Sequence, residues 1–215
     1  MLQQSNSILR LCIVVVVVML VQLSPVQSQD VKIGTQVWTS KNLDVSTFRN
    51  GEPILNVKNR DDWQKAGENK QPAWCYYNFN IENGTKFGKL YNWYAVNDSR
   101  GLAPKGYHIP SDAEWTVLTD FLGGIEIAGF KMKSYTGWAN NGNGDNSSEF
   151  NGLSCGSIIF NGDFYDYSTA GVWWSSSGDF HAKGAWYRSI GAFDEGVFRN
   201  GNNRANGLSV RCIKD

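Results

Sequence analysis

The longest uninterrupted run of apolar residues lies near the start of the chain, over residues 11–21. This run is too short to cross a lipid bilayer, which needs roughly 20 apolar residues. Pro25 follows it, and the small residues Val26 and Ser28 then stand at the spacing that signal peptidase prefers. The pattern therefore predicts a signal peptide over residues 1–28, a secreted protein, and no transmembrane anchor after cleavage.

Alternating apolar and polar residues predict strands at both ends of the remaining chain. Residues 31–38 alternate on either side of Gly34 and Thr35, which predicts a β-hairpin with a two-residue turn. Residues 208–213 alternate as well. This second pattern predicts a closing strand whose inner face includes Cys212.

Helical signals are concentrated between these two strands, and the clearest begins at Ser111. The Ser111 side chain can accept the backbone N–H of Glu114 while the Glu114 side chain reaches back, which is a capping box. The predicted apolar face consists of Trp115, Leu118, Phe121 and Leu122. Gly123 then ends the helix. Shorter helices are expected over residues 59–67, stopped at the glycine, and over residues 89–97.

The composition of the sequence changes at about residue 134, where Gly, Asn, Ser and aromatic residues begin to dominate. Short apolar runs between such residues are typical of short strands joined by tight turns. Residues 29–215 contain no internal repeat and no linker. We therefore predict a single α+β domain over this range, with helices in the first half and a strand-rich, loop-rich second half.

Composition and charge exclude some classes of function. Hydrophobic residues make up 41% and charged residues 19% of the chain, which is typical of a globular protein. The chain has 20 basic and 20 acidic residues and no basic run. Nucleic-acid binders derive most of their affinity from an excess of positive charge, so nucleic acid is not expected as a partner.

Three cysteines remain after removal of the signal peptide: Cys75, Cys155 and Cys212. An odd number in a secreted protein implies one disulfide with one leftover thiol, or no disulfide, and the sequence leaves all three pairings open. The chain has no Cys-x-x-Cys motif, and its only histidines are His108 and His181. A metal site built on these residues is therefore not favoured.

Several segments, taken in order, resemble the Fibrobacter succinogenes major paralogous domain family. The segments are IGTQVW (33–38) with NL (42–43), GKLYNWYA (88–95), PKGYHIPSDAEW (104–115), WWSS (173–176) and LSVRC (208–212). The resemblance runs from about residue 31 to 215 and implies a secreted or surface domain without an established activity. It also implies a fold similar to the C-type-lectin-like and formylglycine-generating-enzyme group. The family usually has a cysteine where this chain has Ala103. If that family cysteine pairs with the one in the last strand, the bridge cannot form here, and Cys212 is then free or pairs with Cys75 or Cys155.

Catalytic constellations are weak in this sequence. His108 and Glu114 stand near one another and suggest acid–base chemistry, but Glu114 is already used by the capping box, and His108 fits a packed loop histidine better. No nucleophile–histidine set has a recognisable spacing. Formylglycine-generating enzymes depend on a copper-binding cysteine pair, which the scattered cysteines do not provide. The chain is therefore not expected to be an enzyme.

An Asn- and Gly-rich run contains the only candidates for a cofactor site, which would bind calcium through Asn141, Asn143 and Asp145. An EF-hand frame fails there, because Asn146 and Gly152 stand where Gly and Glu are needed. The sugar-binding motifs of C-type lectins are also absent. The alternative is a turn region whose backbone needs positive φ. No cofactor is therefore expected, with calcium as the one open alternative.

Three sequons add candidate glycosylation sites at Asn83, Asn97 and Asn146. Glycans would be attached there only in a eukaryotic secretory pathway. The sequence does not name its source, so this modification stays conditional on the host.

Aromatic residues are the remaining candidates for ligand binding. The chain has nine Trp, nine Tyr and eleven Phe, and the candidates in its second half are Trp138, Trp173, Trp174, Trp186 and Tyr187. The alternative is that these rings belong to the core, because Trp and Tyr bury large areas. Trp173 and Trp174 are adjacent, so their rings point to opposite faces of a strand, and we expect one of them to face outward.

These features lead to three hypotheses from different functional classes. The first is a secreted, non-catalytic binding module that recognises a glycan or an extracellular protein through aromatic and Asn/Gly-rich loops. The second is a structural or adhesive component of the extracellular matrix or cell surface without a small ligand. The third is an enzyme of the formylglycine-generating type, against which the missing cysteine pair argues.

Overall fold

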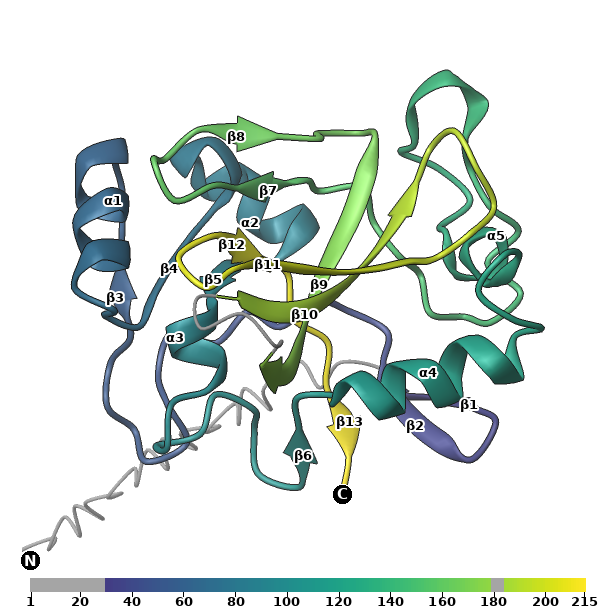
Figure 1. Cartoon of the computed structure of the whole chain (residues 1–215), viewed down its shortest axis with the longest axis horizontal. Helices are drawn as coiled ribbons and strands as arrows, with labels where there is room; N and C mark the ends of the chain where they lie inside the picture. The colour runs from purple at the N-terminus through teal and green to yellow at the C-terminus, as the bar shows by residue number, and fades with distance from the viewer. Residues whose placement is uncertain (1–29, 179–183) are drawn as a thin grey trace, which may run out of the picture.

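The computed structural model describes residues 30–178 and 184–215, and the predicted signal peptide lies outside the described residues. The described chain forms three β-sheets with five short α-helices packed around them (Figure 1). This arrangement confirms the predicted α+β class and the strand-rich second half. No helix in the described ranges has the length and apolar character needed to cross a membrane.

The first sheet joins the beginning and the end of the described chain. Its four strands, in the order β1-β2-β13-β6, are β1 (Asp30–Ile33), β2 (Gln36–Thr39), β13 (Ile213–Lys214) and β6 (Tyr107–His108). The predicted hairpin is confirmed, because β1 and β2 pair antiparallel across the turn at Gly34. Gly34 has a φ of 62°, and an added Cβ would approach the ring of Phe121 to 2.9 Å, so this turn requires glycine.

The second sheet has six strands. Its order is β3 (Leu55–Asn56), β4 (Ala73–Cys75), β5 (Leu90–Asn92), β12 (Gly207–Leu208), β7 (Ser157–Ile158) and β8 (Phe164–Tyr165). The helix predicted over residues 89–97 is therefore wrong in its first half. Residues 90–92 pair with both β4 and β12, and this pairing overrides their helical periodicity. The helix α3 (Trp93–Val96) follows directly, capped by the side chain of Asn92.

The third sheet contains the longest strands, β9 (Ala170–Gly178), β10 (Gly184–Gly191) and β11 (Phe198–Asn203). All pair antiparallel in the order β11-β10-β9. One isolated bridge, from Trp173 of β9 to Ser209, connects this sheet to the closing segment of the chain. Strand β9 therefore joins this sheet to the closing segment, and β11 lies at the opposite edge.

The remaining helices surround these sheets. They are α1 (Arg60–Glu68), α2 (Ile81–Phe87), α4 (Asp112–Phe121) and α5 (Ala128–Met132), with 3₁₀ turns η1 (Tyr77–Phe79) and η2 (Ala139–Asn141). Helix α1 confirms the helix predicted at 59–67, although Gly67 lies inside it and does not stop it. The capping box of α4 is confirmed in both directions. Phe121 does not join the core as predicted: it is 63% exposed and lies over the turn at Gly34.

The closing segment differs from the predicted two-faced strand. Only Gly207–Leu208 and Ile213–Lys214 pair as strands, and the polar residues between them, Ser209 and Arg211, are as fully buried as Val210 and Cys212. Apolar and polar residues alternate in this segment, but both sides of it are buried. The alternation therefore does not mark a face exposed to solvent. Polar groups on both sides must then be paired within the protein.

Substitution of Ser111 tests the confirmed capping box. We expect Ser111→Ala to lower the free energy of unfolding by about 0.5 to 2 kcal/mol, because the Glu114 backbone N–H loses its acceptor. Urea denaturation measures this change, with Ser46→Ala as the control at an exposed serine. Equal losses in both variants would contradict the role of the cap.

Candidate functional site

The structure buries most of the aromatic residues that were candidates for ligand binding. Trp173 and Trp174 do point to opposite faces of β9, but both are fully buried, and Trp138 is buried as well. The prediction that one of the adjacent rings faces outward is therefore wrong. The reason is that β9 is covered on both sides: Trp173 packs in the core cluster around Trp115, and Trp174 in the cluster around Tyr91.

Trp186 and Tyr187 on β10 are partly exposed, but each is held by its surroundings. The guanidinium of Arg199 lies 3.5 Å from the centroid of the Trp186 ring. Tyr187 packs against the core cluster that contains Trp174. Of the five aromatic candidates, these two are the ones that remain accessible, and they lie on consecutive residues with their side chains on opposite faces of the sheet.

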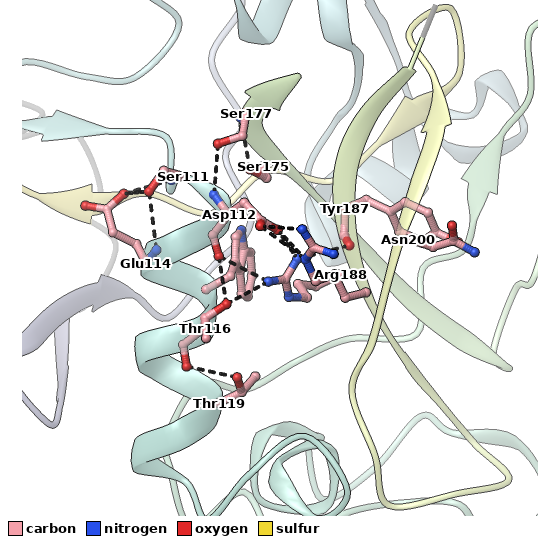
Figure 2. Close-up of polar contacts among 12 residues, drawn as sticks. Ser111, Asp112, Glu114, Thr116, Thr119, Ser175, Ser177, Tyr187, Arg188 and Asn200 are labelled. Carbon is pink, nitrogen blue, oxygen red and sulfur yellow. Dashed lines mark hydrogen bonds and ion pairs between the residues drawn. The ribbon is translucent and has the colours of Figure 1, made fainter. Parts of the chain in front are cut away.

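Arg199 and its neighbour Arg188 connect this sheet to helix α4. Figure 2 shows the contact of Arg188 with Asp112 at the start of that helix. Both guanidinium groups donate to the carboxylate of Asp112, at 2.7 Å from Arg188 Nη1 and 2.8 Å from Arg199 Nη2. Partial burial opposes ionisation of Asp112, but the hydrogen bonds from both arginines outweigh it and lower its pKa. A carboxylate with two cations fixed on it holds α4 against β10 and is not available to a ligand.

The structure brings His108, Glu114 and Asp215 together. The two ring nitrogens of His108 hydrogen-bond with Glu114 and Asp215, each at 2.8 Å. Burial alone would lower the pKa of His108, but the hydrogen bonds with both carboxylates raise it above its ordinary value. Both nitrogens are thus already engaged, and Glu114 also accepts from Ser111 in the capping box. This arrangement supports a packed, ion-paired histidine better than a general base.

The Asn-rich candidates for calcium form turns. Asn143 Oδ1 accepts the backbone N–H of Trp138 at 3.1 Å, and Asp145 Oδ1 accepts that of Ser147 at 3.0 Å. Asn141 has a φ of 59°, as the turn alternative requires. Within residues 30–178 and 184–215, no three His, Cys, Asp or Glu side chains gather as a metal site.

The three sequons lie on different parts of the surface. Asn97 is exposed at the end of α3, whereas Asn83 and Asn146 are partly exposed. Asn83 Nδ2 donates to the carbonyl of Tyr77, and Asn146 Oδ1 accepts the N–H of Asn151. Glycosylation stays a prediction at all three.

The thiols of Cys75, Cys155 and Cys212 are all unpaired and buried. The cysteine count allows one disulfide or none, and the structure has no disulfide among these three cysteines. Burial raises the pKa of all three thiols, that of Cys212 to about 12, so they stay protonated at neutral pH. Ala103 lies in the same core cluster as Cys212, which thus remains a single thiol.

A groove of about 890 Å³ lies beside the first sheet. Four segments far apart in the sequence form its walls, and Cys212 also reaches it. The segments are residues 39–45 after β2, 84–88 at the end of α2, 104–107 before β6, and 151–153. A hollow of this size is typical of a small-molecule or oligomer binding site.

Hydroxyl, amide and aromatic groups line the groove. Thr85 is exposed, and Ser40 and Asn151 are partly exposed. The ring of Tyr107 also lines it, with the phenol oxygen hydrogen-bonded to Asp30 at 2.8 Å. Phe87 closes one wall. These groups can hydrogen-bond to a polar ligand and contact its apolar faces.

The floor of the groove is held by one side chain, Asn42. Its Nδ2 donates to the carbonyl of Phe87 at 2.9 Å and to Ser209 Oγ at 3.2 Å. Its Oδ1 accepts the indole N–H of Trp173 and the Nε–H of Arg211, both at 2.8 Å. An asparagine amide has two donors and two acceptor positions, so all four are used. The floor is therefore fixed by a fully paired polar network.

Arg211 is a buried cation below this floor. Besides Asn42, its guanidinium donates to the carbonyl oxygens of Thr39, Phe150 and Asn151 at 2.7 to 2.9 Å. Burial lowers the pKa of Arg211 to about 9, which still leaves the group charged at neutral pH. Its hydrogen-bond partners are all neutral oxygens. The positive charge is therefore solvated by dipoles and not cancelled by a carboxylate.

One known family matches nearly all of the described chain. The sequence profile of the Fibrobacter succinogenes major domain matches residues 31–214. The chain belongs to the Fibrobacter succinogenes major domain family. Three positions within the segments that carry the resemblance, Asn42, Trp173 and Arg211, meet in the network under the groove. No curated protein and no solved structure gives a significant match to the chain.

Sequence reasoning missed the groove for a structural reason. The residues of its rim are ordinary surface types, such as Ser40 and Thr85, and no spacing connects them. The one available signal was the cluster of polar residues Asn42, Ser209 and Arg211 inside otherwise apolar segments. Buried polar residues in such segments indicate a paired network, although they do not name what it supports.

Proposed function

We propose that this member of the Fibrobacter succinogenes major domain family is a secreted, non-catalytic binding module with a C-type-lectin-like fold, and that its groove binds a glycan. The observation that carries this proposal is the groove itself, with its fixed floor and polar rim. A preformed floor reduces the entropy lost on binding, and hydroxyl and amide groups match the hydroxyl groups of a sugar. The exposed side chain of Tyr167 adds aromatic surface near the groove, since it packs edge-on against Phe87.

This proposal moves the site away from the aromatic residues of β9. The predicted loop surface around Trp173 and Trp174 is replaced by a groove between loops, with Asn151 as its link to the Asn/Gly-rich region. A protein partner is less well supported, because a groove suits an extended or small ligand better than it suits the flat surface of a protein.

A structural or adhesive role is the second candidate function, and one observation favours it. Large apolar side chains are exposed at Phe121, Ile125, Phe193 and Phe198, with Phe193 at 72%. The backbone N–H of Val197 donates to the carbonyl of Ile125, which brings the segment after α4 beside the loop between β10 and β11. Exposed apolar groups of this kind suit contact with other proteins.

The formylglycine-generating activity receives no support from the described thiols. That chemistry needs an accessible pair of cysteines, whereas Cys75, Cys155 and Cys212 are buried and protonated.

A glycan array tests the proposed function. We expect the wild-type protein to bind at least one class of glycan, and Thr85→Trp to lose that binding because the indole fills the groove. Thr85 is exposed, so the substitution should change the free energy of unfolding by only about 0.5 kcal/mol. Thr136→Trp, at an exposed threonine outside the groove, is the matched control and should bind as wild type does. No glycan bound by wild type, or equal binding by both variants, would overturn the proposal.

A further inference from the structure

The groove collects positive charge on a chain that is neutral as a whole. Lys41, Lys86 and Lys105 line it and are exposed. Among the ion pairs of the described residues, none involves these three lysines. The chain has 20 basic and 20 acidic residues in total, so this concentration is local and not a reflection of composition.

The one acidic side chain of the groove lining does not offset this charge. Asp44 forms an ion pair with Lys89, which is buried and also donates to the Asp44 carbonyl at 2.8 Å. The carboxylate of Asp44 is thus already neutralised by a fourth lysine. Among the ion pairs of the described residues, Lys41, Lys86 and Lys105 therefore have no carboxylate partner, although Lys86 Nζ lies 4.7 Å from the centroid of the Phe87 ring.

Arg211 adds a further positive charge from below. Two of the carbonyl oxygens that hold its guanidinium belong to Thr39 and Asn151, which are groove-lining residues. The cation therefore lies one residue beneath the floor. The protein interior there is less polarizable than water, so it screens the positive charge less than water does at the surface. An anion in the groove would be attracted by both the floor and the rim.

We infer that the groove binds an acidic saccharide, one that carries carboxylate or sulfate groups. This inference rests on the proposed glycan-binding function and names the chemical class of its ligand. Hydroxyl groups of the saccharide would bond to Ser40, Thr85 and Asn151, and the anionic groups would pair with the lysines. A neutral saccharide would leave three cations without an anionic partner, whereas an acidic one gains charge-assisted hydrogen bonds from them. Clefts lined by one sign of charge also speed the capture of oppositely charged ligands.

Affinity measurements with three probes test the ligand class. The probes are a carboxylate saccharide (oligogalacturonate), a sulfate ester saccharide (sulfated dextran oligomer) and neutral dextran of the same length. We expect wild-type protein to bind at least one acidic probe more tightly than dextran by about tenfold or more, since about three exposed ion pairs together supply that ratio. The affinity should fall as sodium chloride rises. Whichever acidic probe binds more tightly identifies the anionic group.

A matched pair of triple variants locates the site. One replaces Lys41, Lys86 and Lys105 by glutamine, and its control has the same loss of charge. The control replaces Lys32, Lys58 and Lys65, which are exposed and outside the groove. We expect about a tenfold loss of affinity for the acidic probe in the groove variant and less than about a twofold loss in the control. Unchanged thermal melting would show that both variants are folded.

The outcomes separate the two proposals. Tight binding of a neutral glycan that the groove variant retains and Thr85→Trp loses would overturn the acidic ligand and leave the glycan-binding function intact. Equal losses in both triple variants would show attraction to overall charge and would also overturn the inference. Absence of any saccharide binding by wild type would overturn both proposals.

Discussion

Replacing Arg211 by methionine is expected to lower the free energy of unfolding by about 3 to 5 kcal/mol, enough to remove most of the stability of an ordinary domain. Methionine has a similar length, so the change leaves little cavity, but it supplies no donor. The carbonyl oxygens of Thr39, Phe150 and Asn151 would each lose a hydrogen bond in a buried position. Each such loss costs about 1 to 3 kcal/mol, offset in part because a buried charge is removed.

Arg60→Met is the matched control for this prediction. Arg60 forms an ion pair with Asp163 at 2.7 Å, but both side chains are well exposed. A surface pair of this kind contributes about 0 to 1 kcal/mol, so the control should unfold at nearly the wild-type urea concentration. If Arg211→Met behaved like Arg60→Met, the buried network would not hold the closing segment, and the fixed floor that supports the groove proposal would be in doubt.

Local features of the fold could be predicted from the sequence, and the structure shows why. The hairpin at Gly34 and the capping box at Ser111 each depend on residues within a few positions of one another. Their geometry is set by backbone dihedrals and nearby hydrogen bonds, which the residue types specify directly. The half-wrong helix over residues 89–97 marks the limit. There, the backbone groups of residues 90–92 hydrogen-bond to two strands distant in sequence, β4 and β12, and not within a helix.

Burial was harder to predict than the direction in which side chains point. The sequence predicts that the adjacent rings of Trp173 and Trp174 point to opposite faces of a strand, and this is correct. Whether a face is open depends on what the chain packs onto it. Helix α4 contacts one side, where the indole N–H of Trp115 donates to the carbonyl of Trp174 at 3.4 Å, and the six-stranded sheet covers the other. No period in the sequence of β9 contains that information.

The groove could not be predicted because it belongs to no segment. Its walls come from residues 39–45, 84–88, 104–107 and 151–153, which are brought together only when the first sheet joins β2 to the end of the chain. The lysines of its rim look like ordinary solvated residues when the sequence is examined alone. These lysines indicate a binding site only because they line the same groove and have no carboxylate partner among the described ion pairs there.

Trp173→Ala is expected to cost about 3 to 5 kcal/mol in the free energy of unfolding, as for other large-to-small changes of a buried aromatic residue. Trp173 is fully buried, packs edge-to-face with Phe150 at a centroid distance of 5.5 Å, and donates its indole N–H to Asn42 Oδ1. Removing it leaves a cavity between two layers and weakens the amide that holds the groove floor.

Trp186→Ala provides the comparison, because the same atoms are removed from the neighbouring strand. Trp186 is partly exposed and stacks on Arg199, so its loss should cost about 1 kcal/mol or less. Urea denaturation measures the loss in the free energy of unfolding for each variant. The larger loss is expected for the tryptophan in the core and the smaller one for the tryptophan at the surface. A larger loss at Trp186 than at Trp173 would contradict the arrangement of β9 and β10.

Saccharide binding provides a second readout for the same variant. Trp186→Ala should leave saccharide binding unchanged, since Trp186 lies outside the groove lining. Loss of binding in that variant would return the ligand site to the aromatic surface of the third sheet.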